Sequence, residues 1–107
     1  MAKRIEIAND FSIFLGGRYR SVGPKSGQEF YEDILLPKYE EAIKNNDQLI
    51  IALDGTKGYP SSFLDQSFGE LAREKGVDNV KKTLEFETRV FPWVVDFIKE
   101  EIWAKTK

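Results

Sequence analysis

A short apolar run in the middle of the chain places the strongest limit on its fold. Residues 49–53 read Leu-Ile-Ile-Ala-Leu, with the turn-forming Asn45 and Asn46 before them and Asp54 and Gly55 after them. A continuous apolar run of this length is typical of a central strand that is buried on both faces of a sheet. Because segments with helical periodicity precede and follow it, we predict a single α/β domain over residues 1–107.

Two segments of alternating polarity predict further strands. Ile5 and Ile7 alternate with charged residues over residues 3–8, and Leu84 and Phe86 alternate with glutamates over residues 84–89. Part of the glycine-containing loop, near residues 19–22, is a fourth strand candidate. Helical crossovers connect parallel strands, and only the central run is apolar throughout. We therefore expect a small mixed, mostly parallel sheet of about four strands, with helices mainly on one face.

Three segments carry apolar residues at helical spacing. The first begins at a capping box, Ser26 with Glu29, and Pro37 is predicted to kink it or to lie near the start of a second helix. Another is expected over residues 62–76, and the last begins near Pro92. The three apolar stripes are Phe30, Ile34, Leu35, Tyr39, Ala42 and Ile43, then Leu64, Phe68, Leu71 and Ala72, then Val94, Val95, Ile98 and Ile102.

Two residue types that enzymes often use are absent from the sequence, which has no cysteine and no histidine. Thiol nucleophiles, disulfides and thiolate metal sites are thereby excluded, as is the usual general base for a serine nucleophile. We therefore expect no catalytic residues, no metal and no cofactor. The net charge of −2 and the pI near 5.2 disfavour nucleic acid as the main partner. With no secretory signal and no apolar run near the ~20 residues of a membrane helix, a cytoplasmic location is expected.

A serine pair marks the turn from the central strand into the second helix, where function tends to lie in open α/β sheets. Ser62 is expected to be the N-cap of this helix, and Asp65, three residues on, would complete a capping-box variant. The same position suits a phosphoacceptor, because a phosphate on Ser61 or Ser62 would meet free N–H groups and would place a charge of about −2 on the turn. Both interpretations remain open at this point.

Aromatic and basic residues near this turn suggest further contacts. Tyr59 and Phe63 would anchor a partner if they are exposed and would belong to the core if they are buried. Arg18, Arg20 and the helix start at Ser26 could bind an anion, since an arginine side chain donates two parallel hydrogen bonds to a phosphate. The alternative is a solvated loop, or a salt bridge from Arg18 to a nearby carboxylate. Asp54 is interpreted as a turn residue rather than as the phosphoaccepting aspartate of a receiver domain.

The serine turn resembles that of the STAS domains (sulfate transporter and anti-sigma factor antagonist). Their turn carries Asp-Ser-Ser-Gly, and a partner kinase phosphorylates the second serine; here the turn reads Pro60-Ser61-Ser62-Phe63. The chain is more closely similar to the STAS-like family of unknown function over roughly residues 5–90. The motifs that carry this likeness are Gly16-Gly17-Arg18, Ser26-Gly27-Gln28-Glu29-Phe30, Ser61-Ser62-Phe63-Leu64-Asp65 and Phe68-Gly69.

The resemblance implies a regulatory module that binds another protein. Ser62 would be the phosphoacceptor, with Ser61 beside it, and the partner would be a histidine-kinase-type ATPase. From their place at the turn, we expect Tyr59, Phe63 and Asp65 to contact the partner. Two alternatives are a small anion- or nucleotide-binding domain and a standalone inhibitor, for example from a mobile element, that docks on another protein.

The apolar face of the last predicted helix is compatible with either a monomer or a dimer. Trp93, Phe97 and Trp103 widen its apolar face beyond one stripe. Core packing explains such a widening, and so does an interface with a partner or with a second copy of the chain.

Overall fold

The computed structural model describes residues 3–106 and contains a parallel three-stranded sheet. The strands are β1 (Lys3–Glu6), β2 (Leu49–Ala52) and β3 (Leu84–Glu87), in the order β1-β2-β3. Ile5 lies opposite Ile51, which lies opposite Phe86. The predicted α/β class, the central position of the apolar run and the parallel pairing are confirmed.

The fourth strand is a wrong prediction. Residues 19–22 form a turn, in which the Val22 N–H donates to the Tyr19 carbonyl at 3.0 Å. Prolines and glycines around this segment allow the chain to fold back on itself, so the loop has no extended edge that could join the sheet.

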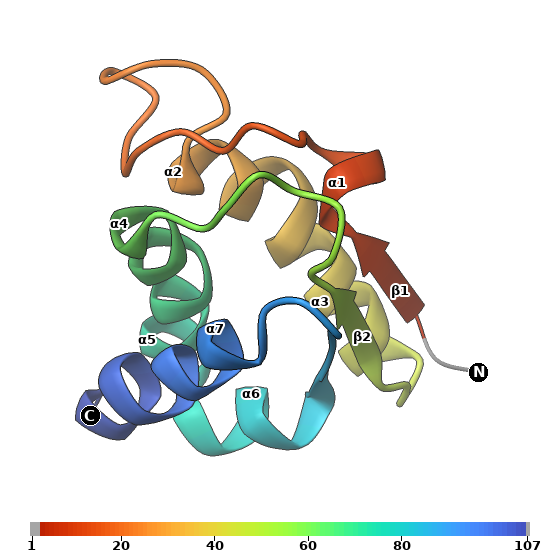
Figure 1. Cartoon of the computed structure of the whole chain (residues 1–107). Coiled ribbons are helices and arrows are strands. Elements are labelled where there is room, and N and C mark those ends of the chain that lie inside the picture. Colours follow the sequence, from red (N-terminus) through yellow and green to blue (C-terminus); the bar gives the residue numbers. More distant parts are fainter. Residues whose placement is uncertain (1–2, 107) are drawn as a thin grey trace.

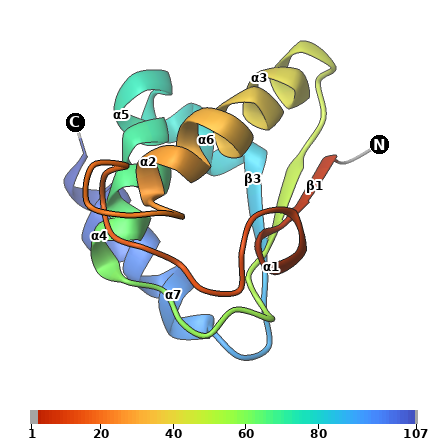
Figure 2. The same cartoon turned by 90° about the horizontal axis from the view of Figure 1, so that it is seen from above.

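Helices cover one face of the sheet, as Figures 1 and 2 show. Ile5, Ile51 and Leu84 point into the core from the covered face. The opposite face carries Arg4 and, on β2, Ile50, which is only half-buried. The strand order advances in one direction, so right-handed crossovers place both connecting helices on the same side. The expected one-sided cover is confirmed, whereas burial of the central strand on both faces is a wrong prediction.

Within residues 3–106, three long helical stretches and two short helices make up the remaining regular structure, and each long stretch contains a π-helical stretch. The first stretch comprises α2 (Gly27–Phe30), η1 (Tyr31–Leu35) and α3 (Leu36–Lys44). The second comprises α4 (Ser61–Leu64), η2 (Asp65–Gly69) and α5 (Glu70–Lys75). The last comprises α7 (Pro92–Phe97), η3 (Ile98–Ile102) and a 3₁₀ turn, η4 (Trp103–Lys105). None of the helices described within residues 3–106 is both long and apolar enough to cross a bilayer.

Pro37 lies in the first turn of α3, directly after the π-helical stretch η1. The Leu36 N–H donates to the Tyr31 carbonyl, five residues back, so the turn is widened just before the proline. A proline is tolerated at such a junction because its missing N–H and its ring disturb a regular turn less there. This position agrees with the predicted start of a second helix near Pro37.

The short helices α1 (Ile7–Asp10) and α6 (Val77–Thr83) were not predicted from the sequence. Gly76 separates α6 from α5 with a φ of +92°, a conformation that favours glycine. Helix α6 buries only Val80 and Thr83, so its apolar periodicity is too weak to predict a helix.

Aromatic rings fill much of the core between the sheet and the helices. Phe30 and Phe63 stack with centroids 5.6 Å apart, and Phe68 meets Phe86 edge-on at 5.4 Å.

The two tryptophans of the last helical stretch differ in burial. Trp103 is 1% exposed and its indole N–H donates to the Phe68 carbonyl at 3.1 Å, whereas Trp93 is 54% exposed. Among the residues of the three predicted apolar stripes, Ile43 is the one that is exposed, at 48%, and the others are buried or half-buried.

Candidate functional site

Three loops follow the carboxyl ends of the strands, the first of them after the short helix α1, and lie along one edge of the molecule (Figure 2). They comprise residues 11–26, 53–60 and 88–91. The Lys57 N–H donates to the Ile13 carbonyl at 2.8 Å, which joins the first two loops. This edge therefore forms one continuous surface that contains the serine turn.

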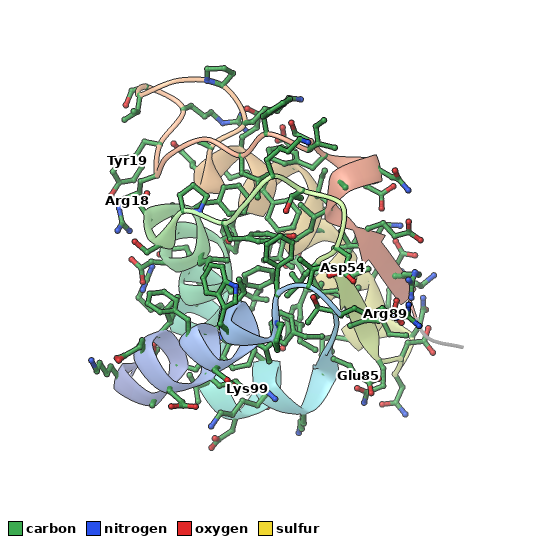
Figure 3. The ribbon with its side chains drawn as sticks, in the orientation of Figure 1. Arg18, Tyr19, Asp54, Glu85, Arg89 and Lys99 are labelled. Carbon is green, nitrogen blue, oxygen red and sulfur yellow. The ribbon has the colours of Figure 1, made fainter. Side chains whose placement is uncertain are left out.

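Asp54 fastens the second loop to the third. Its carboxylate accepts hydrogen bonds from the Thr88 hydroxyl at 2.5 Å and from the N–H groups of Arg89 at 2.8 Å and Val90 at 3.1 Å. The Thr88 bond, with help from the two backbone donors, holds the pKa of Asp54 below its ordinary value. The structure thus confirms Asp54 as a turn residue (Figure 3).

The serine pair begins the second long helix but does not cap it. Helix α4 starts at Ser61, and the N-cap position is Pro60, which has no side-chain acceptor. The prediction that Ser62 is the N-cap is therefore wrong. Ser61 is exposed and Ser62 is half-buried. Neither hydroxyl has a hydrogen-bond partner among the residues that the structure describes.

The two aromatic residues beside the serines belong to the core. Phe63 is fully buried, and Tyr59 donates from its hydroxyl to the Leu53 carbonyl at 2.6 Å. The Tyr59 ring meets Phe91 edge-on at 5.1 Å, and burial raises the pKa of the Tyr59 hydroxyl above its usual range. Of the two roles that the sequence left open for these aromatics, the structure selects core packing, because Phe63 is fully buried and Tyr59 is only 6% exposed.

Arg18 and Asp65, which belong to two different sequence motifs, form an ion pair instead of two separate sites. Arg18 Nη1 lies 2.5 Å from Asp65 Oδ2 and 3.5 Å from Gln66 Oε1. Arg73 donates from Nη1 to the other Asp65 oxygen at 3.1 Å, so both guanidinium groups lower the pKa of Asp65 against the opposing effect of burial. Asp65 therefore links the glycine-containing loop to the second helix rather than completing a capping box.

Arg20 and Ser26 do not join Arg18 in an anion site. Arg20 pairs with Glu32 at 3.2 Å and with Asp33 at 2.9 Å, away from Asp65. The Ser26 hydroxyl is buried and accepts from the Glu29 N–H at 3.0 Å, which confirms Ser26 as the N-cap of α2. Since both arginines already have carboxylate partners, the three residues do not converge on an open anion site.

Two motif glycines allow close contact where side chains would clash. A Cβ on Gly27 would lie 2.6 Å from the Phe63 carbonyl oxygen, and a Cβ on Gly69 would lie 2.8 Å from Asp65 Oδ1. The Ser-Gly-x-x-Phe motif thus caps α2, brings it against α4 and places Phe30 on Phe63. Most motif residues hold this helix junction together, and the serine hydroxyls are the exception.

An exposed apolar rim lies along the same edge, and Trp93 is the one rim residue that the sequence analysis named as a candidate interface residue. We define the apolar rim as Ile13, Phe14, Val90 and Trp93, of which Phe14 is 64% exposed. A pocket of about 380 Å³ is lined by Phe14, Leu15, Lys57, Gly58, Tyr59 and Pro60. Ser61 follows Pro60 directly. The available signal was Ile-Phe-Leu in a segment that contributes to no predicted helix or strand.

A larger hollow lies at the opposite edge, near the amino ends of the strands, where α3, α5 and α6 meet. Its volume is about 910 Å³. Lys75 and Glu40 at its wall pair with each other at 3.1 Å, and none of the predicted site residues lines it. We therefore place the candidate site at the serine edge, where motif residues and exposed apolar side chains occur together.

Comparison with protein-family models gives a match over residues 26–88 to the STAS-like domain of unknown function (DUF4325). The chain belongs to this family. No curated protein and no solved structure gives a match. In this STAS-like domain the matched segment contains the Ser26 cap, the helix junction and the serine turn. The apolar rim comes from the first loop, the third loop and the start of α7, and its residues lie outside the matched segment.

Proposed function

We propose that this STAS-like domain is a non-catalytic regulatory module that binds another protein at the serine edge. The observation that carries the proposal is that Phe14, which is 64% exposed, lines a pocket that reaches Pro60, next to the serine pair. Exposed aromatic side chains beside a pocket are common anchors at protein interfaces. The other rim residues would widen the contact along the same edge.

Serine phosphorylation is the proposed regulator of this binding. Ser61 and Ser62 present hydroxyls without protein partners among the described residues, next to the wall of the pocket. A phosphate would add a charge of about −2 at the border of an apolar contact, where its desolvation opposes binding. The family likeness supports Ser62 as the acceptor and a histidine-kinase-type ATPase as the partner.

Two other functions have less support. Nucleotide or anion binding would need Arg18 and Arg20 to leave their carboxylates. A standalone inhibitor would use the same apolar rim, so the identity of the partner separates it from the regulatory module.

The test is affinity capture of the chain, produced together with its genomic neighbours, followed by mass spectrometry of partners and phosphosites. Phe14→Ser removes the exposed anchor. Ile43→Ser is the matched control, because Ile43 is 48% exposed but lies at the opposite edge.

Capture of an ATPase-type kinase by the wild type and by Ile43→Ser, but not by Phe14→Ser, would support the proposal. Phosphate on Ser62 together with weaker capture of the partner would support regulation by phosphorylation. Equal capture by all three proteins would exclude the apolar rim as the binding surface.

A further inference from the structure

Arg18 lies over the stretch of helix that begins with Ser62. Its guanidinium contacts Asp65 at 2.5 Å and Gln66 at 3.5 Å. These residues follow Ser62 by three and four positions, so both are its neighbours along the helix surface. Figure 3 shows Arg18 beside α4, at the border between the loop and the second helix.

We propose that Arg18 is the internal receptor for a phosphate on Ser62, and that phosphorylation moves its guanidinium from Asp65 to the phosphate. This inference rests on the proposed phosphorylation of the serine turn. In that step the Ser62 hydroxyl oxygen attacks the terminal phosphorus of a nucleoside triphosphate held by the kinase. The bond from that phosphorus to the bridging oxygen breaks, nucleoside diphosphate leaves, and a kinase base takes the hydroxyl proton.

The ion pairs allow this exchange of partners. Arg18 uses Nη1 for both of its side-chain contacts within the described residues, and a guanidinium has five N–H donors, so donors remain for a phosphate. Asp65 would keep Arg73, which donates to its carboxylate at 3.1 Å and to its carbonyl at 3.0 Å. A bidentate arginine–phosphate pair is stronger than the contact through one nitrogen to Asp65 that it would replace.

The main chain of the loop would stay in place during the exchange. The Arg18 carbonyl accepts from the Gln28 N–H at 3.0 Å, and the Gly17 carbonyl accepts from the Gly27 N–H at 2.8 Å. The side chain of Arg18 therefore turns while the backbone remains attached to α2. Phosphorylation would fold the phosphate back onto the loop and change the charge pattern beside the pocket.

The test is a ³¹P NMR titration of the full chain with phosphoserine installed at position 62 by genetic encoding. The sign of the pKa change is decisive, because Asp65 alone would raise the phosphate pKa above its usual value near 6, whereas Arg18 would lower it. We expect a phosphate pKa about 0.5 or more below that of the same protein in urea. Arg18→Gln should abolish this lowering.

Arg20→Gln is the matched control, because Arg20 belongs to the same loop but pairs with Glu32 and Asp33. It should leave the phosphate pKa unchanged, and amide NMR spectra would verify that each variant is folded. An equal pKa in wild type and Arg18→Gln would overturn the inference, and so would a raised pKa. Since the phosphate is installed without a kinase or partner, this outcome is independent of whether the proposed binding function is correct.

Discussion

At the closest approach of the first two long helices, Gly27 of α2 lies against the main chain of Phe63. Gly27→Ala should destabilise the protein by about 1–3 kcal/mol, because the added Cβ would lie 2.6 Å from the Phe63 carbonyl oxygen and must push the helices apart. Alanine is the better helix former, so propensity alone predicts the opposite sign. Urea denaturation monitored by circular dichroism measures the difference.

Gly23→Ala is the control for this substitution, because a Cβ added at Gly23 would have no neighbouring atom within 4 Å. It should leave the free energy of unfolding unchanged or raise it slightly. If Gly27→Ala proved as harmless as Gly23→Ala, the close approach would not constrain the helix junction.

Phe30 and Phe14 are both phenylalanines of the first half of the chain, but Phe30 is fully buried and Phe14 is 64% exposed. Phe30→Ala should lower the free energy of unfolding by about 3–5 kcal/mol, because it removes a buried ring that stacks on Phe63. Phe14→Ala should change it by less than about 0.5 kcal/mol, since that ring is mostly exposed. Urea denaturation again measures both values. Comparable losses for the two variants would show that Phe14 also packs in the core and is not a free anchor.

At the scale of elements, Asp54 joins the end of β2 to the loop between β3 and α7. The pKa of Asp54 is below its ordinary value. Its carboxylate therefore contributes fully to the stability of the fold above the unfolded pKa of about 3.9, and this stability is lost as the pH falls through the folded pKa. Asp54→Asn should therefore lower the melting temperature at pH 7 more than at pH 3. In the variant an amide NH₂ would replace one of the two oxygens that accept from Thr88, Arg89 and Val90.

Thermal unfolding of wild type and variant across this pH range tests that expectation. Asp96→Asn on α7 is the control, because Asp96 is exposed and its variant should change the melting temperature at pH 7 less than Asp54→Asn does. A melting difference for Asp54→Asn that grows toward pH 3 would contradict the role of the carboxylate.

The first residue of α4 was predicted wrongly from the sequence. Serine is a preferred N-cap, so the pattern Ser62-x-x-Asp65 predicted a capping box. In the structure Pro60 takes the N-cap position, and Asp65 instead pairs with Arg18 and Arg73. The local motif did not contain the information that an arginine 47 residues earlier competes for that carboxylate.

At the scale of the molecule, the folded core extends beyond the segment that the family model matches. Strand β1 and the helix that begins with α7 lie outside residues 26–88, and they contribute the buried Ile5, Val94, Ile98 and Trp103. A fragment of residues 26–88 should therefore fail to unfold cooperatively, whereas the full chain should show one transition. Circular dichroism during heating distinguishes the two, and a sharp transition in the fragment would contradict the prediction.

Periodicity and contacts a few residues apart were enough to predict the α/β class, the parallel pairing around a central apolar strand, the Ser26 cap and the helical stripes. The serine motif was enough to locate the turn before the second helix. The burial of Tyr59 and Phe63, the ion pair between Arg18 and Asp65, and the exposure of Phe14 beside the serines became known from the folded structure alone. Burial and ion pairing of these residues depend on which distant segments pack against them, and a linear pattern does not specify that packing.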